Sequence, residues 1–177
     1  MVWPDSTMVC SGKPVFIPDY ECYLHAGIGV KILNVGKSIN KKFASRYYKE
    51  FTSMAFILPK DSSDAVSYYR NPYACNFVSD YSVICGDFIP IEKSDGIATK
   101  VCVNVEPLKD ISVGKQIQIL NVNYDILDEI ISSASEANTL KTGDIVAFMM
   151  SERFNVNRDN LLKISINNNI TLENKLK

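Results

Sequence analysis

The chain has 177 residues, of which 46% are hydrophobic and 22% charged, and its formal net charge is −1. This composition is typical of one globular domain with a full core, so we expect a single domain over residues 1–177. The absence of a basic surplus argues against nucleic-acid binding, and no apolar run reaches the ~20 residues of a membrane span.

Five cysteines are scattered along the chain without a CxxC spacing: Cys10, Cys22, Cys75, Cys85 and Cys102. An odd number at irregular spacing is typical of free thiols rather than of a disulfide framework or a zinc site. The N terminus also does not show the apolar segment of a signal peptide. We therefore expect a cytoplasmic protein with reduced cysteines.

The first elements expected are a short edge strand at Lys13–Pro18 and a long central strand at about Ile28–Val35. In the second strand, Ile28, Val30 and Ile32 occupy alternate positions. Since successive side chains of a strand point to opposite faces, these three predict one buried face.

A helix is predicted after a turn at Gly36. Ser38 can serve as its N-cap, because a serine hydroxyl accepts a hydrogen bond from an N–H of the first turn. Ile39, Phe43 and Tyr47 then recur every four residues, as on the apolar face of an amphipathic helix. The basic residues of this region are expected on the solvated face: Lys37, Lys41 and Lys42.

The same stretch resembles the fumarylacetoacetate hydrolase family. IPD at 17–19, GK at 36–37, FA at 43–44 and RYY at 46–48 follow the order of that family's pattern. The resemblance covers nearly the whole chain and weakens toward the C terminus. It implies an α+β, mainly β fold, a mixed β-roll with two or three peripheral helices. It also implies that the chain lacks the family's N-terminal segment, which carries a catalytic His–Glu pair.

Strands and turns are expected through the middle of the chain. The apolar run Phe51–Leu58 predicts a buried strand that ends at Pro59. Asp61–Tyr69 is weakly helical in pattern, and Ser82–Ile91 predicts a short strand and a turn. Ala98–Val105 alternates valines with polar residues, which predicts a half-buried strand.

A strand, a helix and a hairpin are expected toward the C terminus. The strand is predicted at Gln116–Leu120, and the helix from an N-cap at Asp125 to about Glu136, with Leu127, Ile130, Ile131 and Ala134 on its apolar face. The loop at 141–144 resembles the family's K-T-G-D motif and should lead into a core strand. The asparagines at 167–169 predict a tight hairpin between Leu162–Ile166 and Ile170–Leu176.

The family resemblance also locates the positions of a metal site. Family members bind Mg²⁺ or a similar ion through three carboxylates, two of them spaced two residues apart on the central strand. These positions fall on His25, Gly27 and Ala55. Because glycine and alanine offer no side-chain ligand, the resemblance implies that the metal site is lost, and we expect no metal or other cofactor.

Two further positions of the family's site are changed. The family's substrate-facing lysine falls on Phe77, although Asp80 of the same motif matches, and a small-residue loop falls on residues 148–151. We therefore predict a vestigial pocket at His25, Gly27, Ala55, Phe77 and Asp80. Its space should be partly filled by large apolar side chains: Phe77, Phe148, Met149 and Met150.

His25 is the only histidine, and two interpretations are open. It could be a transition-metal ligand or a general base, since its ordinary pKa of about 6.5 lies near neutrality. Alternatively it replaces a family ligand and makes a local hydrogen bond. A dyad with Cys22 is disfavoured, because residues three apart on an extended strand face opposite sides.

Two classes of function follow from these observations. The first is a degenerate, non-catalytic member of the fumarylacetoacetate hydrolase family that serves as a binding or assembly partner. The second is a hydrolase, isomerase or decarboxylase that depends on Mg²⁺ or Mn²⁺ and acts on a β-diketone or oxo-acid. The resemblance also implies a homodimer, with pairing to a paralogous family member as the alternative.

Overall fold

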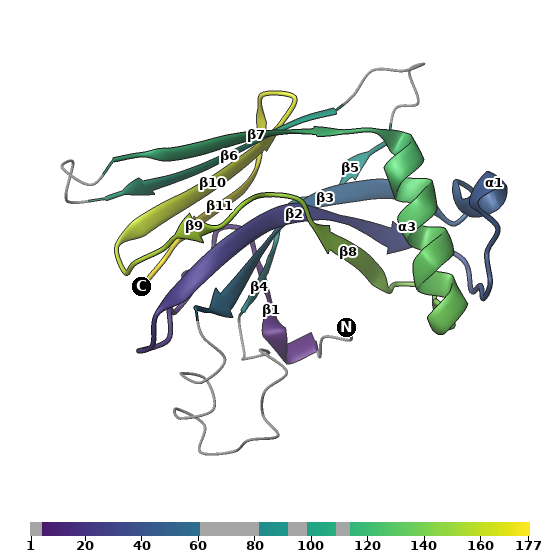
Figure 1. The fold of residues 1–177 in the computed structure, drawn as a ribbon, viewed down its shortest axis with the longest axis horizontal. Helices are drawn as coiled ribbons and strands as arrows, with labels where there is room; N and C mark the ends of the chain where they lie inside the picture. Colours follow the sequence, from purple (N-terminus) through teal and green to yellow (C-terminus); the bar gives the residue numbers. More distant parts are fainter. Residues whose placement is uncertain (1–4, 61–81, 92–98, 109–113) are drawn as a thin grey trace.

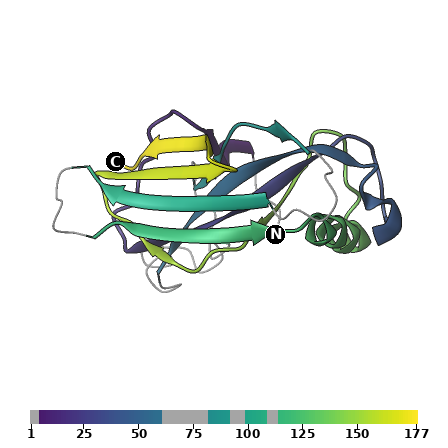
Figure 2. The same cartoon turned by 90° about the horizontal axis from the view of Figure 1, so that it is seen from above.

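The computed structural model describes residues 5–60, 82–91, 99–108 and 114–177. Two β-sheets lie one above the other, and a helix stands at one end of both (Figure 1). Seen from above, the smaller sheet covers the larger one and the helix is viewed nearly along its axis (Figure 2). The arrangement is the predicted α+β, mainly β fold.

The larger sheet has seven strands and is mixed. Its main path follows the order β1 (Met8–Cys10), β4 (Val83–Cys85), β3 (Tyr48–Pro59), β2 (Cys22–Ile32) and β8 (Ile145–Met149). β5 (Ile89–Pro90) pairs with β3, and β9 (Phe154–Asn155) pairs with β2. The β1–β4 pair is parallel and the other pairs are antiparallel. β8 is therefore an edge strand.

The smaller sheet is antiparallel, with the order β11 (Asn169–Lys175), β10 (Asn160–Ile166), β6 (Thr99–Pro107) and β7 (Gln116–Val122). The predicted hairpin is confirmed between β10 and β11. Asn167 and Asn168 have φ of 49° and 69°, the left-handed values that a two-residue hairpin turn of this kind requires at both positions.

The core lies between the two sheets. β2 contributes a row of fully buried side chains on alternate positions: Leu24, Ala26, Ile28, Val30 and Ile32. β6 and β10 face them with a second row: Val101, Val103, Val105, Leu162, Ile164 and Ile166. The predicted alternations are therefore confirmed. The apolar run in β3 is buried on both faces, because β3 lies in the interior of the sheet and the opposite face of the sheet carries a second cluster.

The C-terminal helix is confirmed as α3 (Tyr124–Ala137), although its N-cap differs from the prediction. The capping side chain is Asn123, which accepts a hydrogen bond from the N–H of Asp125 at 3.1 Å. Leu127 and Ile131 are fully buried against the end of the core. A short 3₁₀ turn, η1 (Asp5–Thr7), precedes β1.

The predicted helix after Gly36 is wrong in extent. α1 (Lys41–Ala44) is a single turn that is capped by Asn40, and Ser38 has a left-handed φ of 51°. The N–H of Ile39 donates to the Ser135 hydroxyl of α3 at 2.8 Å, which holds this segment out of a helix. From Tyr48 onward the chain pairs with β2 instead. Competition from these two neighbours overrides the local periodicity.

Three further expectations need correction. Lys13–Pro18 is not a strand, since only Val15 forms an isolated bridge, with Leu176. The central strand occupies Cys22–Ile32 rather than Ile28–Val35. β8 is only half-buried at the edge of the sheet, although its Val146 and Phe148 pack against the core. Asp61–Tyr69 lies outside the described residues.

No helix in the described ranges is both long enough and apolar enough to cross a lipid bilayer.

Candidate binding site

The outer face of the larger sheet, which points away from the smaller sheet, carries the predicted positions His25 and Gly27. In the β2–β3 register, His25 lies opposite Phe56 and Gly27 lies opposite Met54. Residues directly opposite each other in an antiparallel pair share a face. Met54 and Phe56 of β3 form a small apolar cluster with Val83 and Cys85 of β4.

Ala55 does not share this face with His25 and Gly27. It lies opposite Ala26 and is fully buried in the core between the sheets. Because the side-chain period of a strand is two, a shift of one residue moves a position to the other face. The β3 residues that face His25 and Gly27 are Phe56 and Met54. Phe77 and Asp80 lie outside the described residues.

Gly27 sits where β8 approaches β2 too closely for any side chain. A Cβ at this position would lie 1.9 Å from the carbonyl oxygen of Phe148. At Gly29, a Cβ would lie 2.4 Å from the sulfur of Met54 and 2.9 Å from Cγ2 of Ile145. Backbone and apolar side chains therefore occupy the space that larger side chains of β2 would need. A carboxylate at residue 27 would require β8 to move.

His25 is held by the chain that follows β8. Its Nδ1 lies 2.9 Å from the carbonyl oxygen of Ser151, and since a carbonyl only accepts, Nδ1–H is the donor. The Ser151 hydroxyl accepts from the N–H of Ala26 at 2.7 Å and donates to the carbonyl of Glu152 at 2.7 Å. This arrangement agrees with a local hydrogen-bonding role for the imidazole.

The surroundings of His25 are aromatic and cationic. The Tyr23 ring meets the imidazole edge-on, with 5.2 Å between ring centroids. The Arg153 guanidinium lies over the same Tyr23 ring, 4.5 Å from its centroid. Cys22 lies on the opposite face, buried in the core, where burial raises the pKa of its thiol to about 11. The expectation that Cys22 and His25 face opposite sides is confirmed.

The predicted filling of the vestigial pocket is wrong for two of its residues. Phe148 and Met150 pack against the core between the sheets. Met149 lies opposite Gly27 on the outer face and is 41% exposed. Instead, Met54 and Ile145 cover Gly29, as the close approach of their side chains shows.

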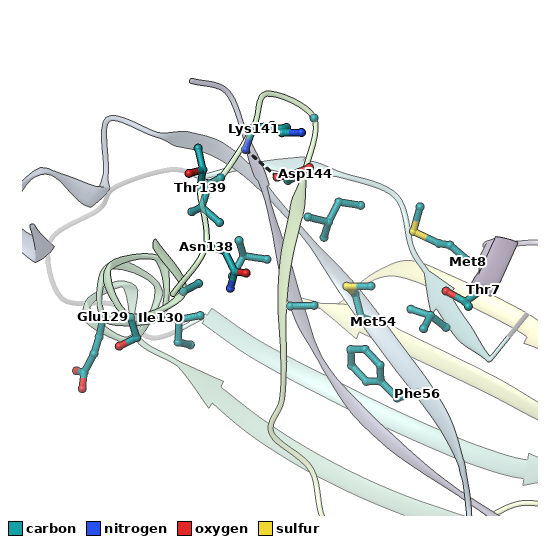
Figure 3. Close-up of a pocket in the computed structure, with 18 of the residues that line it drawn as sticks. Thr7, Met8, Met54, Phe56, Glu129, Ile130, Asn138, Thr139, Lys141 and Asp144 are labelled. Carbon is teal, nitrogen blue, oxygen red and sulfur yellow. Dashed lines mark hydrogen bonds between the residues drawn. The ribbon is translucent and has the colours of Figure 1, made fainter. Parts of the chain in front are cut away.

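A pocket of about 1040 Å³ lies beside these residues and runs past β8 to α3. In Figure 3, Met8, Met54 and Phe56 lie on one side of β8, and Glu129 and Ile130 of α3 on the other. Further apolar lining comes from β4, β8 and α3: Val83, Ile126, Ala134, Ile145, Val146 and Ala147. The floor of the pocket is therefore mainly hydrocarbon and thioether.

Polar groups gather at the end of the pocket where α3 leads into β8. The Asp144 carboxylate accepts from the backbone N–H of Lys141 at 2.7 Å, and Gly143 adopts the φ of 94° that this turn needs. Glu129 is paired with Lys41 at 3.1 Å. A pocket with an apolar floor and a charged mouth suits an amphipathic ligand.

Sequence reasoning missed most of this pocket. Its walls come from β1, β3, β4, α3 and β8, which are far apart in the chain. The one local signal was the motif at 141–144, whose lysine and aspartate form the mouth. Exposed apolar residues such as Met8 and Ile126 give no pattern until the sheet brings them together.

No protein-family model matches the sequence, and no characterised protein matches it in sequence. Solved structures do match. One is a protein from Yersinia pestis assigned to the fumarylacetoacetate hydrolase family, with 19% identity and a TM-score of 0.79 over 100% of this chain and 84% of that one. The present chain has the fumarylacetoacetate hydrolase fold. The resemblance noted in the sequence is thus supported at the level of fold.

Two other neighbours of this fold are named enzymes. A 5-carboxymethyl-2-hydroxymuconate delta-isomerase from Mycobacterium smegmatis shares 15% identity and a TM-score of 0.77, over 99% of this chain and 67% of that one. A fumarylpyruvate hydrolase from Pseudomonas aeruginosa, whose structure is a complex with Mn²⁺ and pyruvate, shares 15% identity and a TM-score of 0.76, over 98% and 76%. The fold is therefore one that hydrolases and isomerases use.

His25, Gly27 and the side chains opposite them do not form a binding site for a divalent ion. Mg²⁺ and related ions need carboxylate and other hard oxygen ligands, whereas the residues opposite are Met54 and Phe56. The nearby Arg153 adds a positive charge. Within the described ranges, no three His, Cys, Asp or Glu side chains lie close enough together to hold a metal ion.

Proposed function

We propose that this chain is a non-catalytic binding protein with the fumarylacetoacetate hydrolase fold, in one domain over residues 1–177. The observation that carries the proposal is the outer face of β2. Gly27 has no room for a side chain, and Met54 and Phe56, which lie opposite Gly27 and His25, offer no anionic oxygen. Two or more anionic oxygens are normally required to offset the dehydration of Mg²⁺ or Mn²⁺.

The proposed ligand site is the pocket between α3 and the outer face of the larger sheet. Its volume of about 1040 Å³ is sufficient for a small organic molecule. Met54, Phe56 and Ile130 would contact the apolar part of the ligand, and Lys141 and Asp144 would meet its polar end. We infer an amphipathic molecule as the ligand class.

The first experiment tests the non-catalytic assignment. Purified protein is titrated with Mn²⁺ by calorimetry and then incubated with fumarylpyruvate and Mn²⁺. We expect no micromolar Mn²⁺ binding and no loss of substrate. Micromolar binding that His25→Ala abolishes, or Mn²⁺-dependent turnover, would overturn the proposal.

The second candidate function is a divalent-metal-dependent hydrolase, isomerase or decarboxylase of a β-diketone or oxo-acid. It is favoured by the named activities of the structural neighbours, a delta-isomerase and a fumarylpyruvate hydrolase. Turnover in the first experiment, with Mg²⁺ or Mn²⁺ as the cofactor, would establish this candidate instead.

The pocket is tested with the amphipathic probe 8-anilinonaphthalene-1-sulfonate. Ala147→Phe places a ring within the pocket lining, and Val35→Phe is the matched control at an exposed position outside that lining. We expect Ala147→Phe to remove most of the fluorescence of the bound probe and Val35→Phe to retain it. Equal fluorescence in both variants would place the probe elsewhere.

For assembly, we propose a homodimer in the cytoplasm, with a paralogous partner as the alternative. The supporting observation is that Ile117 and Ile119, two residues apart on edge strand β7, are each 54% exposed. Large exposed apolar side chains grouped on one face are typical of interfaces. Light scattering on the 19.8 kDa chain should give twice that mass, and Ile119→Lys should lower it. A monomer mass for the unmodified chain would exclude the homodimer.

A further inference from the structure

Two cysteines far apart in the sequence are neighbours across the β1–β4 pair. Cys10 and Cys85 are register partners in this parallel ladder, at one margin of the larger sheet (Figure 1). Neighbouring strands lie about 4.8 Å apart, which is within the ~4.4–6.8 Å that separates the Cα atoms of a disulfide.

Both side chains point to the outer face of the sheet. Val9 and Ile84, which are also register partners, belong to the core between the sheets. The residues on either side of them along each strand must therefore face outward. Cys85 accordingly packs in the outer cluster with Met54 and Val83.

The backbone holds the pair in this register. The N–H of Ser11 donates to the carbonyl of Cys85 at 2.9 Å, and the Asn174 side chain donates to the carbonyl of Cys10 at 3.2 Å. β1 has only three residues and pairs with one strand, β4, so the two cysteines lie at the edge of the sheet.

We propose that Cys10 and Cys85 form an oxidation site at which hydrogen peroxide produces an intramolecular disulfide. In the first step, the Cys10 thiolate attacks one peroxide oxygen, the O–O bond breaks, and hydroxide leaves and takes up a proton. In the second step, Cys85 loses its proton and its sulfur attacks the sulfur of the Cys10 sulfenic acid. The S–O bond breaks and water leaves. Two thiols lose two electrons to one peroxide, and two waters form.

The two thiols have different roles because their surroundings differ. Cys10 is exposed and can meet peroxide, whereas Cys85 is only 5% exposed. Burial raises the pKa of the Cys85 thiol to about 11, so this thiol is protonated at neutral pH. Cys10 is therefore the attacking thiol and Cys85 the resolving one.

The disulfide would fasten the wall of the candidate pocket. Met8 and Val83, two residues before the cysteines on the same strands, line that pocket and are themselves register partners. The oxidation site needs only the β1–β4 register, and its test is independent of whether the pocket binds a ligand.

The test is mass spectrometry of the full chain after treatment with hydrogen peroxide and alkylation of the remaining thiols under denaturing conditions. We expect loss of two hydrogens per chain, and a peptide pair that joins Cys10 to Cys85 as the main crosslinked product. Cys102→Ser is the matched control and should leave the yield of this product unchanged.

Cys10→Ser supplies the second measurement, because its exposed position should leave folding intact. In this variant Cys85 should remain available to alkylation after peroxide treatment and unfolding. A crosslink of Cys10 to any other cysteine, a disulfide-linked dimer, or sulfinic acid at Cys10 with Cys85 still free would each overturn the proposal.

Discussion

The two faces of the β2–β3 pair differ in how their residues are packed. On the inner face, Leu24, Ile28 and Ile32 are fully buried in a continuous core with β6 and β10. On the outer face, Gly27 and Gly29 have no side chains, and the backbone of β8 and the Met54 side chain lie against them. The inner face holds the two sheets together. The outer face contributes Met54 and Phe56 to the candidate pocket.

The comparison shows that the two faces of one strand pair can differ independently of each other. Because adjacent residues of a strand face opposite sides, substitutions on the outer face need not disturb packing on the inner face. The chain matches the Yersinia pestis structure at a TM-score of 0.79 with 19% identity, which is a likeness of fold. Similarity of fold here carries little information about the chemistry of the outer face.

The largest expected effect comes from adding one methyl group to the outer face. Gly27→Ala places a Cβ against the carbonyl oxygen of Phe148, so either β2 or β8 must shift. We expect a loss of about 4 kcal/mol or more in the free energy of unfolding, measured by urea denaturation. Gly114→Ala, where an added Cβ meets nothing within 4 Å, should change it by less than about 0.5 kcal/mol. Equal effects would mean that β8 does not approach β2 as described.

A second pair of variants compares the faces directly across β2 and β8. Ile28 is fully buried on the inner face, and its truncation to alanine should cost about 2–5 kcal/mol through lost burial and a residual cavity. Met149→Ala on the outer face, where the side chain is 41% exposed, should cost less than about 1 kcal/mol. The midpoint of urea unfolding measures both. A larger cost for Met149→Ala would show that the outer face is the more tightly packed.

The third and smallest expected effect is the difference in stability cost between removing the Ser151 hydroxyl and removing the His25 imidazole. Ser151→Ala leaves the N–H of Ala26 without its acceptor, which should cost about 1–3 kcal/mol. His25→Ala removes one half-buried hydrogen bond and should cost about 0.5–1.5 kcal/mol. Thermal unfolding of both variants checks the order. If His25→Ala were the more damaging, the imidazole would be the main anchor of this segment.

A buried strand face and one hairpin turn of this protein follow from short-range patterns in the sequence. The alternation of Ile28, Val30 and Ile32 identifies one buried face without knowledge of any partner. Asn167 and Asn168 identify the hairpin, because few other residues tolerate left-handed backbone at two successive positions. Each pattern rests on interactions within a few residues, so it can be read locally.

The tertiary structure alone decided which residues share a face and what lies over them. Ala55 and Phe56 are adjacent in sequence, yet only the register with β2 shows that Phe56 is the one that lies beside His25. The single turn of α1, the pocket beside β8 and the meeting of Cys10 with Cys85 likewise depend on segments far apart in the chain. Register and helix extent are decided by burial against distant partners, and that energy has no local signature in the sequence.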